Sequence, residues 1–141
     1  MKSIEISTTY QVGTSSHAGF KFLTKEEYDE VKAHPVIGAE ILDNISEIPG
    51  ISIGAHWHHE RYDGGGYPDG LAGTAIPEVA RIVCVADAYD MMTSKRKYRD
   101  IMSQSTVRAE LLRGRGTQFD PEIVDHMLAM INEDTEYQMH E

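Results

Sequence analysis

The sequence has little that would build a cross-linked, secreted or membrane-spanning protein. Its single cysteine, Cys84, permits no internal disulfide, so a reducing cytoplasm is the expected location. No apolar run is long enough to cross a bilayer, and the first residues lack the basic-then-apolar pattern of a signal peptide. Only 13 basic residues stand against 23 acidic ones, and the formal charge of -10 argues against broad binding to duplex DNA or to anionic membranes. Any anionic ligand must therefore meet a local cluster of positive charge.

The length and composition allow one folded domain. The chain has 141 residues, of which 40% are hydrophobic, and it shows no internal repeat or second-domain boundary. Residues 1–22 are expected to form an irregular N-terminal arm, residues 23–133 a helical domain, and residues 134–141 an acidic tail that frays.

Helical signals begin at Thr24. Thr24 and Glu27 have the spacing of a capping box, in which each side chain bonds the other residue's backbone N–H. The pair His34-Pro35 is expected to end this helix, because proline lacks a donor and disfavours helical geometry at the residue before it. A second helix would then run to about Asn44, which places His34 at the bend between the two.

The most apolar helix is expected from Pro77 to about Thr93. Its residues are hydrophobic almost all round, so it should lie at the centre of the domain. Asp87 falls in the middle of it, and an isolated buried carboxylate is so costly that it must be paired, hydrogen-bonded or bound to a metal. The alternative to a metal ligand is a salt bridge with an arginine of another helix. Further helices are expected from Ile51 towards His58, from Ser105 to Arg113 and from Asp120-Pro121 onwards.

The run from Trp57 to Gly70, WHHERYDGGGYPDG, combines possible metal ligands with a flexible backbone. Neutral imidazoles are common ligands for zinc and other transition metals, and His58 and His59 are adjacent. Gly64, Gly65 and Gly66 allow positive φ and a close approach to a ligand. The alternative is a solvent-exposed loop with incidental histidines.

A basic cluster follows the apolar helix. Four of the five residues from Lys95 to Arg99 are basic in an otherwise acidic chain. This run could be a solvated helix end, favoured by the helix dipole, or an anchor for phosphate. The composition alone favours neither interpretation.

Four segments in this order resemble the HD-GYP family of the HD hydrolase superfamily: LTKEEYDEVKAHPVIGAEIL, HHERYDGGGYPDGLAGTAIP, ARIVCVADAYDMMTSKRKYR and GTQFDPEIVD. The resemblance implies an all-α helical bundle of HD-domain type. It also implies a metal-dependent phosphodiesterase that hydrolyses cyclic di-GMP to the linear dinucleotide or to GMP. The implied metal ligands are His34, His58, His59 and Asp87. The residues implied to face the nucleotide are Gly66, Tyr67, Pro68, Arg96 and Arg99.

The sequence departs from the family pattern in one respect. Family members carry a His-Asp pair upstream of the matched region, whereas no histidine here is followed by aspartate. The bundle is therefore expected to be N-terminally incomplete and to expose an apolar face. The four remaining ligands suffice for one divalent transition metal ion, with iron or manganese implied by the resemblance.

Three hypotheses follow for the function. The first is a phosphodiesterase that is active alone or completed by a partner chain. The second is a non-catalytic module that binds a cyclic dinucleotide or a partner. The third is a helical fragment that forms a homodimer to cover its open face.

Overall fold

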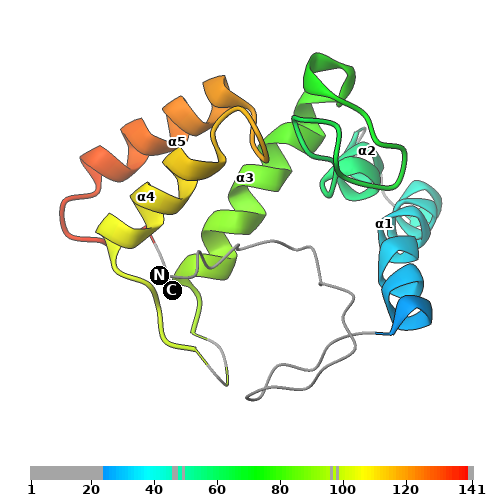
Figure 1. The fold of residues 1–141 in the computed structure, drawn as a ribbon, viewed down its shortest axis with the longest axis horizontal. Helices are drawn as coiled ribbons and strands as arrows, with labels where there is room; N and C mark the ends of the chain where they lie inside the picture. The colour runs from blue at the N-terminus through cyan, green and yellow to red at the C-terminus, as the bar shows by residue number, and fades with distance from the viewer. Residues whose placement is uncertain (1–23, 46–47, 49, 96, 98, 140–141) are drawn as a thin grey trace.

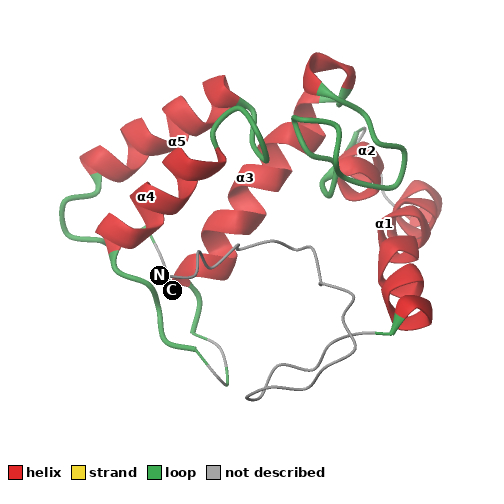
Figure 2. Cartoon of the chain, in the orientation of Figure 1, coloured by secondary structure: helices red, strands yellow, loops and turns green. Residues whose placement is uncertain are grey.

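The computed structural model describes residues 24–45, 48, 50–95, 97 and 99–139. Its helices are α1 (Lys25–Ile45), α2 (Ile51–Trp57), a short 3-10 helix (Gly73–Ala75), α3 (Glu78–Thr93), α4 (Gln104–Gly114) and α5 (Pro121–Glu133). Over these ranges no strand is present, and the expected all-α fold is confirmed (Figure 2). No helix in the described part of the chain has both the length and the apolar character to span a membrane.

Helix α1 begins as expected but does not break where expected. The backbone N–H of Thr24 donates to the Glu27 carboxylate at 2.8 Å, and the N–H of Glu27 donates to Thr24 Oγ1 at 3.1 Å, which completes the capping box. The expected interruption at His34-Pro35 is wrong, because α1 continues through Pro35 for 21 residues. Pro35 is fully buried, so its packing offsets the one backbone hydrogen bond that a proline removes.

Helix α3 is the central element, as expected. In Figure 1 it runs between the α1–α2 pair on one side and the α4–α5 pair on the other. The core that it shares with α4 and α5 consists of Val85, Ala88, Tyr89, Met92, Val107, Leu111, Phe119, Val124 and Ile131. Burial of this apolar surface against α4 and α5 is the main stabilising contribution on that side of the domain.

The outer face of α3 is not covered, although the sequence predicted a helix buried nearly all round. Val79 is 44% exposed and Ile82 is 48% exposed. On α1, Ile37 and Ile41 are more than half exposed. The described helices contact α3 along only part of its circumference, which leaves these apolar side chains at the surface.

The segment that joins α4 to α5 and the segment after α5 are both held by carboxylates. Asp120 caps α5 by accepting from the backbone N–H groups of Glu122 and Ile123. In residues 134–139 of the expected acidic tail, Asp134 accepts from the backbone N–H groups of Gln138 and Met139. The Tyr137 hydroxyl also donates to the Met102 carbonyl at 2.6 Å, which docks the tail on the core.

Candidate metal centre

Three histidines from two separate segments meet beside α2. His34 lies on α1, and His58 and His59 follow directly after α2. One ring nitrogen from each histidine lies within 4.8 Å of the other two, which is close enough for the three to share one ion. Among the described residues, these three form the group of His, Cys, Asp and Glu side chains that meets this criterion. Helices α1 and α2 pack against each other, and this packing brings the two segments together.

The backbone orients two of these imidazoles. His34 Nδ1 donates to the carbonyl of Val31, and His58 Nδ1 donates to the carbonyl of Ala55 at 2.8 Å. A ring nitrogen that donates to a carbonyl must carry the proton, so the lone pair of each ring lies on Nε2. Hydrogen bonds of this kind are the usual way in which proteins fix the tautomer of a metal-binding histidine.

His59 completes the group and is held neutral. Its Nε2 lies 3.0 Å from Nε2 of His34, and its ring stacks on Tyr67 with 5.0 Å between centroids and 14° between planes. Burial, followed by the nearby imidazoles of His58 and His34, lowers the pKa of His59 from 6.5 to about 3. A neutral imidazole keeps the lone pair that a metal requires, so the donor set fits a divalent transition metal ion.

Asp87 approaches the same place from α3. It is half-buried and lines a small cavity together with His58 and His59. Its carboxylate does not belong to the tight group of three imidazoles. Within the described part of the chain no hydrogen bond or ion pair reaches Asp87, so the predicted alternative, a salt bridge to an arginine of another helix, finds no support there.

Cys84 lies one helical turn before Asp87 and lines the same cavity. Burial, then the negative charge of Asp87, raises the pKa of the Cys84 thiol to about 12. The thiol is therefore protonated at neutral pH and is a poor metal ligand, since thiolates rather than thiols bind metals.

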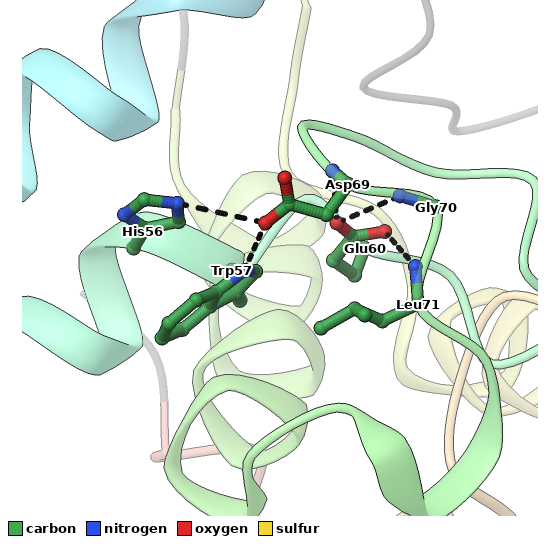
Figure 3. A network of polar contacts seen from close by, with 6 residues as sticks. All are labelled: His56, Trp57, Glu60, Asp69, Gly70 and Leu71. Atoms are coloured by element: carbon green, nitrogen blue, oxygen red, sulfur yellow. Dashed lines mark hydrogen bonds and ion pairs between the residues drawn. The ribbon is translucent and has the colours of Figure 1, made fainter.

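Glu60 organises the loop that follows the histidines, and sequence reasoning assigned it no role. It is 2% exposed, and its carboxylate accepts from the backbone N–H groups of Asp69, Gly70 and Leu71 at 2.6, 3.1 and 3.0 Å. Figure 3 shows these three hydrogen bonds together with another, which the Trp57 indole N–H donates to the Asp69 carboxylate at 2.7 Å. The only signal in the sequence was a charged residue directly after two histidines. That pattern does not distinguish a metal ligand from a residue that accepts hydrogen bonds from the loop backbone.

The glycines of the loop serve two different purposes. Gly64 has φ +84°, a conformation that other residues rarely adopt. Gly66 has no room for a side chain, because a Cβ there would lie 2.4 Å from the Arg61 nitrogen and 2.5 Å from the His59 carbonyl oxygen. This close approach lets the Tyr67 N–H reach the His59 carbonyl and sets the Tyr67 ring against the His59 imidazole.

The structure places the remaining predicted residues as follows. Pro68 is half-buried and follows a cis peptide bond in the loop. The Arg99 guanidinium donates to the carbonyl of Met91, a residue that lines the small cavity together with His58 and His59. Arg96 lies outside the described residues.

A larger cavity of about 250 Å³ adjoins the small one and shares Ala88 and Gln118 with it. Two ion pairs line it: Arg61 with Asp63 at 2.8 Å, and Arg113 with Glu110 at 2.6 Å. The candidate metal centre therefore opens beside a polar cavity that carries both signs of charge.

Comparison with known proteins gives consistent matches. A family model described as "HD domain" matches residues 14–123. The chain is 48% identical over 109 residues to the cyclic di-GMP phosphodiesterase response regulator RpfG of Xanthomonas campestris, covering 75% of this chain and 29% of RpfG. It is 38% identical over 117 residues to a cyclic di-GMP phosphodiesterase of Thermotoga maritima, covering 81% of this chain and 32% of that protein.

Other relatives are named for a different cyclic dinucleotide. The 3'3'-cGAMP-specific phosphodiesterase 2 of Vibrio cholerae is 36% identical over 109 residues, covering 75% of this chain and 21% of that protein. The crystal structure of a cyclic GMP-AMP-specific phosphodiesterase of V. cholerae matches in fold with a TM-score of 0.64 at 22% identity, over 81% of this chain and 26% of that one. The chain spans no more than a third of the length of these relatives.

Proposed function

This chain belongs to the HD domain family, and we propose that it is a metal-dependent phosphodiesterase domain that acts on cyclic di-GMP. The expected place within the HD-GYP branch is confirmed by the relatives named as cyclic di-GMP phosphodiesterases. Because the chain matches only part of those relatives, the activity is proposed from the site, and cyclic di-GMP as the substrate is proposed from the family resemblance.

The observation that carries the proposal is the convergence of the three imidazoles. Lone pairs at Nε2 of His34 and His58 are directed away from the backbone carbonyls that hold their Nδ1 protons. His59 lies between these rings and stays neutral. Asp87 adds a negative charge at the wall of the same cavity, as expected for a site that holds a cation.

The proposed ligands of the ion are His34, His58, His59 and Asp87. A divalent ion held by these residues would supply Lewis acidity towards a phosphoryl oxygen and would lower the pKa of water. The chain supplies orientation: Val31 and Ala55 hold two ligand rings, and Tyr67 stacks on the third. The identity of the ion as iron or manganese, and binding of the nucleotide by Gly66, Tyr67, Pro68, Arg96 and Arg99, are parts of the proposal that follow from the family resemblance.

The test is direct. The purified chain is loaded with Mn²⁺ or, without oxygen, with Fe²⁺, and is incubated with cyclic di-GMP. Chromatography is expected to show the linear dinucleotide or GMP. A variant in which His58 is replaced by alanine should form neither product. Failure of the loaded wild-type chain to convert cyclic di-GMP would remove the catalytic proposal.

A second function is favoured by one feature of the sequence. No histidine is followed by aspartate, so the chain lacks the dipeptide that completes the family's metal site. Calorimetric binding of cyclic di-GMP without turnover would identify a non-catalytic binding module. Four apolar side chains of α1 and α3 are exposed: Ile37, Ile41, Val79 and Ile82. Their exposure supports the proposal that a further N-terminal segment or a second copy of the chain covers this surface. Sedimentation of the chain would distinguish a dimer from a monomer.

A further inference from the structure

Lys32 brings a positive charge close to the candidate metal centre. It lies on α1, half-buried, and its ammonium lies 4.6 Å from the centre of the Tyr28 ring and 5.9 Å from the centre of the Tyr67 ring. Tyr67 in turn stacks on His59. The Tyr67 ring therefore lies close both to the ammonium and to a proposed metal ligand.

The contacts of Lys32 differ from those of most arginines in the described part of the chain. Four arginines there form ion pairs with carboxylates: Arg61, Arg81, Arg113 and Arg115. Lys32 instead lies over ring faces, and no ion pair with a described carboxylate is present. Ring faces attract a cation without using up its N–H donors, so an ammonium held in this way can still donate to an anion.

We propose that Lys32 binds the second phosphodiester of a cyclic dinucleotide while the first lies at the histidines. A cyclic dinucleotide carries two phosphodiesters on one sugar–phosphate ring, and hydrolysis opens one of them at a time. A cation outside the metal site would stabilise the group that is not being cleaved. In a chain of net charge -10, a lysine beside the site provides it. This inference rests on the proposed function and adds a substrate contact to it.

A purely structural role is the competing explanation. Tyr28 and Lys32 are four residues apart on α1, a spacing at which a lysine and an aromatic ring stabilise a helix whatever the ligand. Such a role would change the stability of α1 but would not depend on how many phosphates the substrate carries.

The experiment compares two substrates in the Mn²⁺-loaded chain. Cyclic di-GMP carries two phosphodiesters, whereas bis(p-nitrophenyl) phosphate carries one, which would lie at the metal site. Lys32→Met is expected to raise KM for cyclic di-GMP roughly tenfold or more, which corresponds to the loss of one charge-assisted contact. It should change KM for bis(p-nitrophenyl) phosphate far less. Lys32→Arg should restore most of the affinity, and Lys25→Met, on the same helix and exposed, is the matched control.

Each result decides the matter. A KM for cyclic di-GMP that is unchanged in Lys32→Met overturns the proposal, and an equal loss on both substrates does the same, because Lys32 would then act through Tyr67 and His59. If the wild-type chain binds cyclic di-GMP without turnover, the same variants are compared by calorimetry, and equal affinity of wild type and Lys32→Met overturns the inference alone. Absence of both binding and turnover in the wild type removes the proposed function together with this inference.

Discussion

His34 Nδ1 donates to the carbonyl of Val31, the same carbonyl that Pro35 leaves without its helical amide partner. In an uninterrupted helix the N–H of residue 35 would donate to this oxygen, and proline has no N–H. The imidazole thus replaces the missing donor. The hydrogen bond from His34 Nδ1 therefore satisfies the Val31 carbonyl, and it also turns Nε2 of His34 towards His59.

Replacing His34 by asparagine separates these two roles. The asparagine amide can still donate to Val31, but it has no atom at the position of Nε2. We expect the His34→Asn chain to fold with nearly unchanged stability and to bind Mn²⁺ at least tenfold more weakly. Metal titration followed by electron paramagnetic resonance measures the affinity. His126→Asn, at an exposed position on α5, is the control and should bind as the wild type does.

Asp87 is predicted to matter for the metal and not for the fold. Asp87→Asn removes the charge from the cavity wall without changing its shape, so metal affinity and phosphodiesterase activity should each fall at least tenfold. Asp90 is three residues further along α3, is exposed, and accepts a hydrogen bond from Ser94. Asp90→Asn should leave both quantities within twofold of wild type. Equal losses in the two variants would contradict the assignment of Asp87 as a ligand.

Gly66 tests whether the loop depends on close backbone packing. Gly66→Ala places a methyl group within 2.6 Å of three backbone atoms, so the loop must shift. We expect a loss of about 1–3 kcal/mol in the free energy of unfolding, the usual cost of overpacking. At Gly65 the nearest atom would be a carboxylate oxygen of Asp63 at 3.2 Å, which can move. Urea denaturation of Gly65→Ala should therefore show a much smaller change.

The three backbone hydrogen bonds that Glu60 accepts predict that replacing it by glutamine lowers the free energy of unfolding. Glu60→Gln keeps the size of the side chain but replaces one acceptor oxygen by an NH₂ group, which at this buried position opposes a part-buried backbone N–H. An unsatisfied buried donor of this kind costs about 2 kcal/mol. Glu30→Gln, at an exposed position on α1, should change the unfolding free energy by less than about 0.5 kcal/mol. Similar values for the two variants would show that the network adds nothing to stability.

Asp120 predicts a stability difference that depends on pH. Burial by itself raises the pKa of Asp120, but the Arg81 guanidinium at 2.5 Å and the backbone N–H groups of Ile123 and Glu122 outweigh burial and hold the pKa below 3.8. A lowered pKa in the folded state stabilises the protein above the unfolded value, and this contribution is lost as the pH falls through the folded value. Asp120→Asn keeps the helix cap but breaks the ion pair.

The expected cost of Asp120→Asn is roughly 2 kcal/mol at pH 6, because Arg81 is left partly buried without its partner. The difference from wild type should shrink as the pH falls below about 3.8. Urea denaturation at a series of pH values measures it. Asp125→Asn, which breaks an exposed pair with Arg115, should have little effect at any pH. A difference that stays constant with pH would argue against the ion pair as its cause.

The helix ends were the most predictable features. The capping box at Thr24 and the cap at Asp120 occur as expected, because in each a side chain bonds the backbone within a few residues. Helix α3 begins after Pro77 as expected, because the fixed φ of proline and its missing N–H suit the start of a helix. The break at Pro35 was predicted wrongly from an equally local rule, namely that proline interrupts a helix. A local rule does not include the burial of Pro35 or the donor that His34 supplies.

For the site, the sequence indicated which residue types could bind a metal, and the family resemblance named them. It did not show that Glu60 accepts three backbone hydrogen bonds, since its partners lie 9 to 11 residues later in a loop of irregular geometry. Nor did it show that Lys32 lies over Tyr67, a contact between α1 and that loop.

By itself, the sequence determined an all-α domain, the positions of most helix ends and the kinds of ligand available, because these depend on composition and on contacts between near neighbours. Only the tertiary structure decided that His34 meets His58 and His59, that Asp87 lines their cavity, and that α3 keeps an exposed face. These features depend on how α1, α2 and α3 pack, and packing joins residues whose separation along the chain carries no local signal.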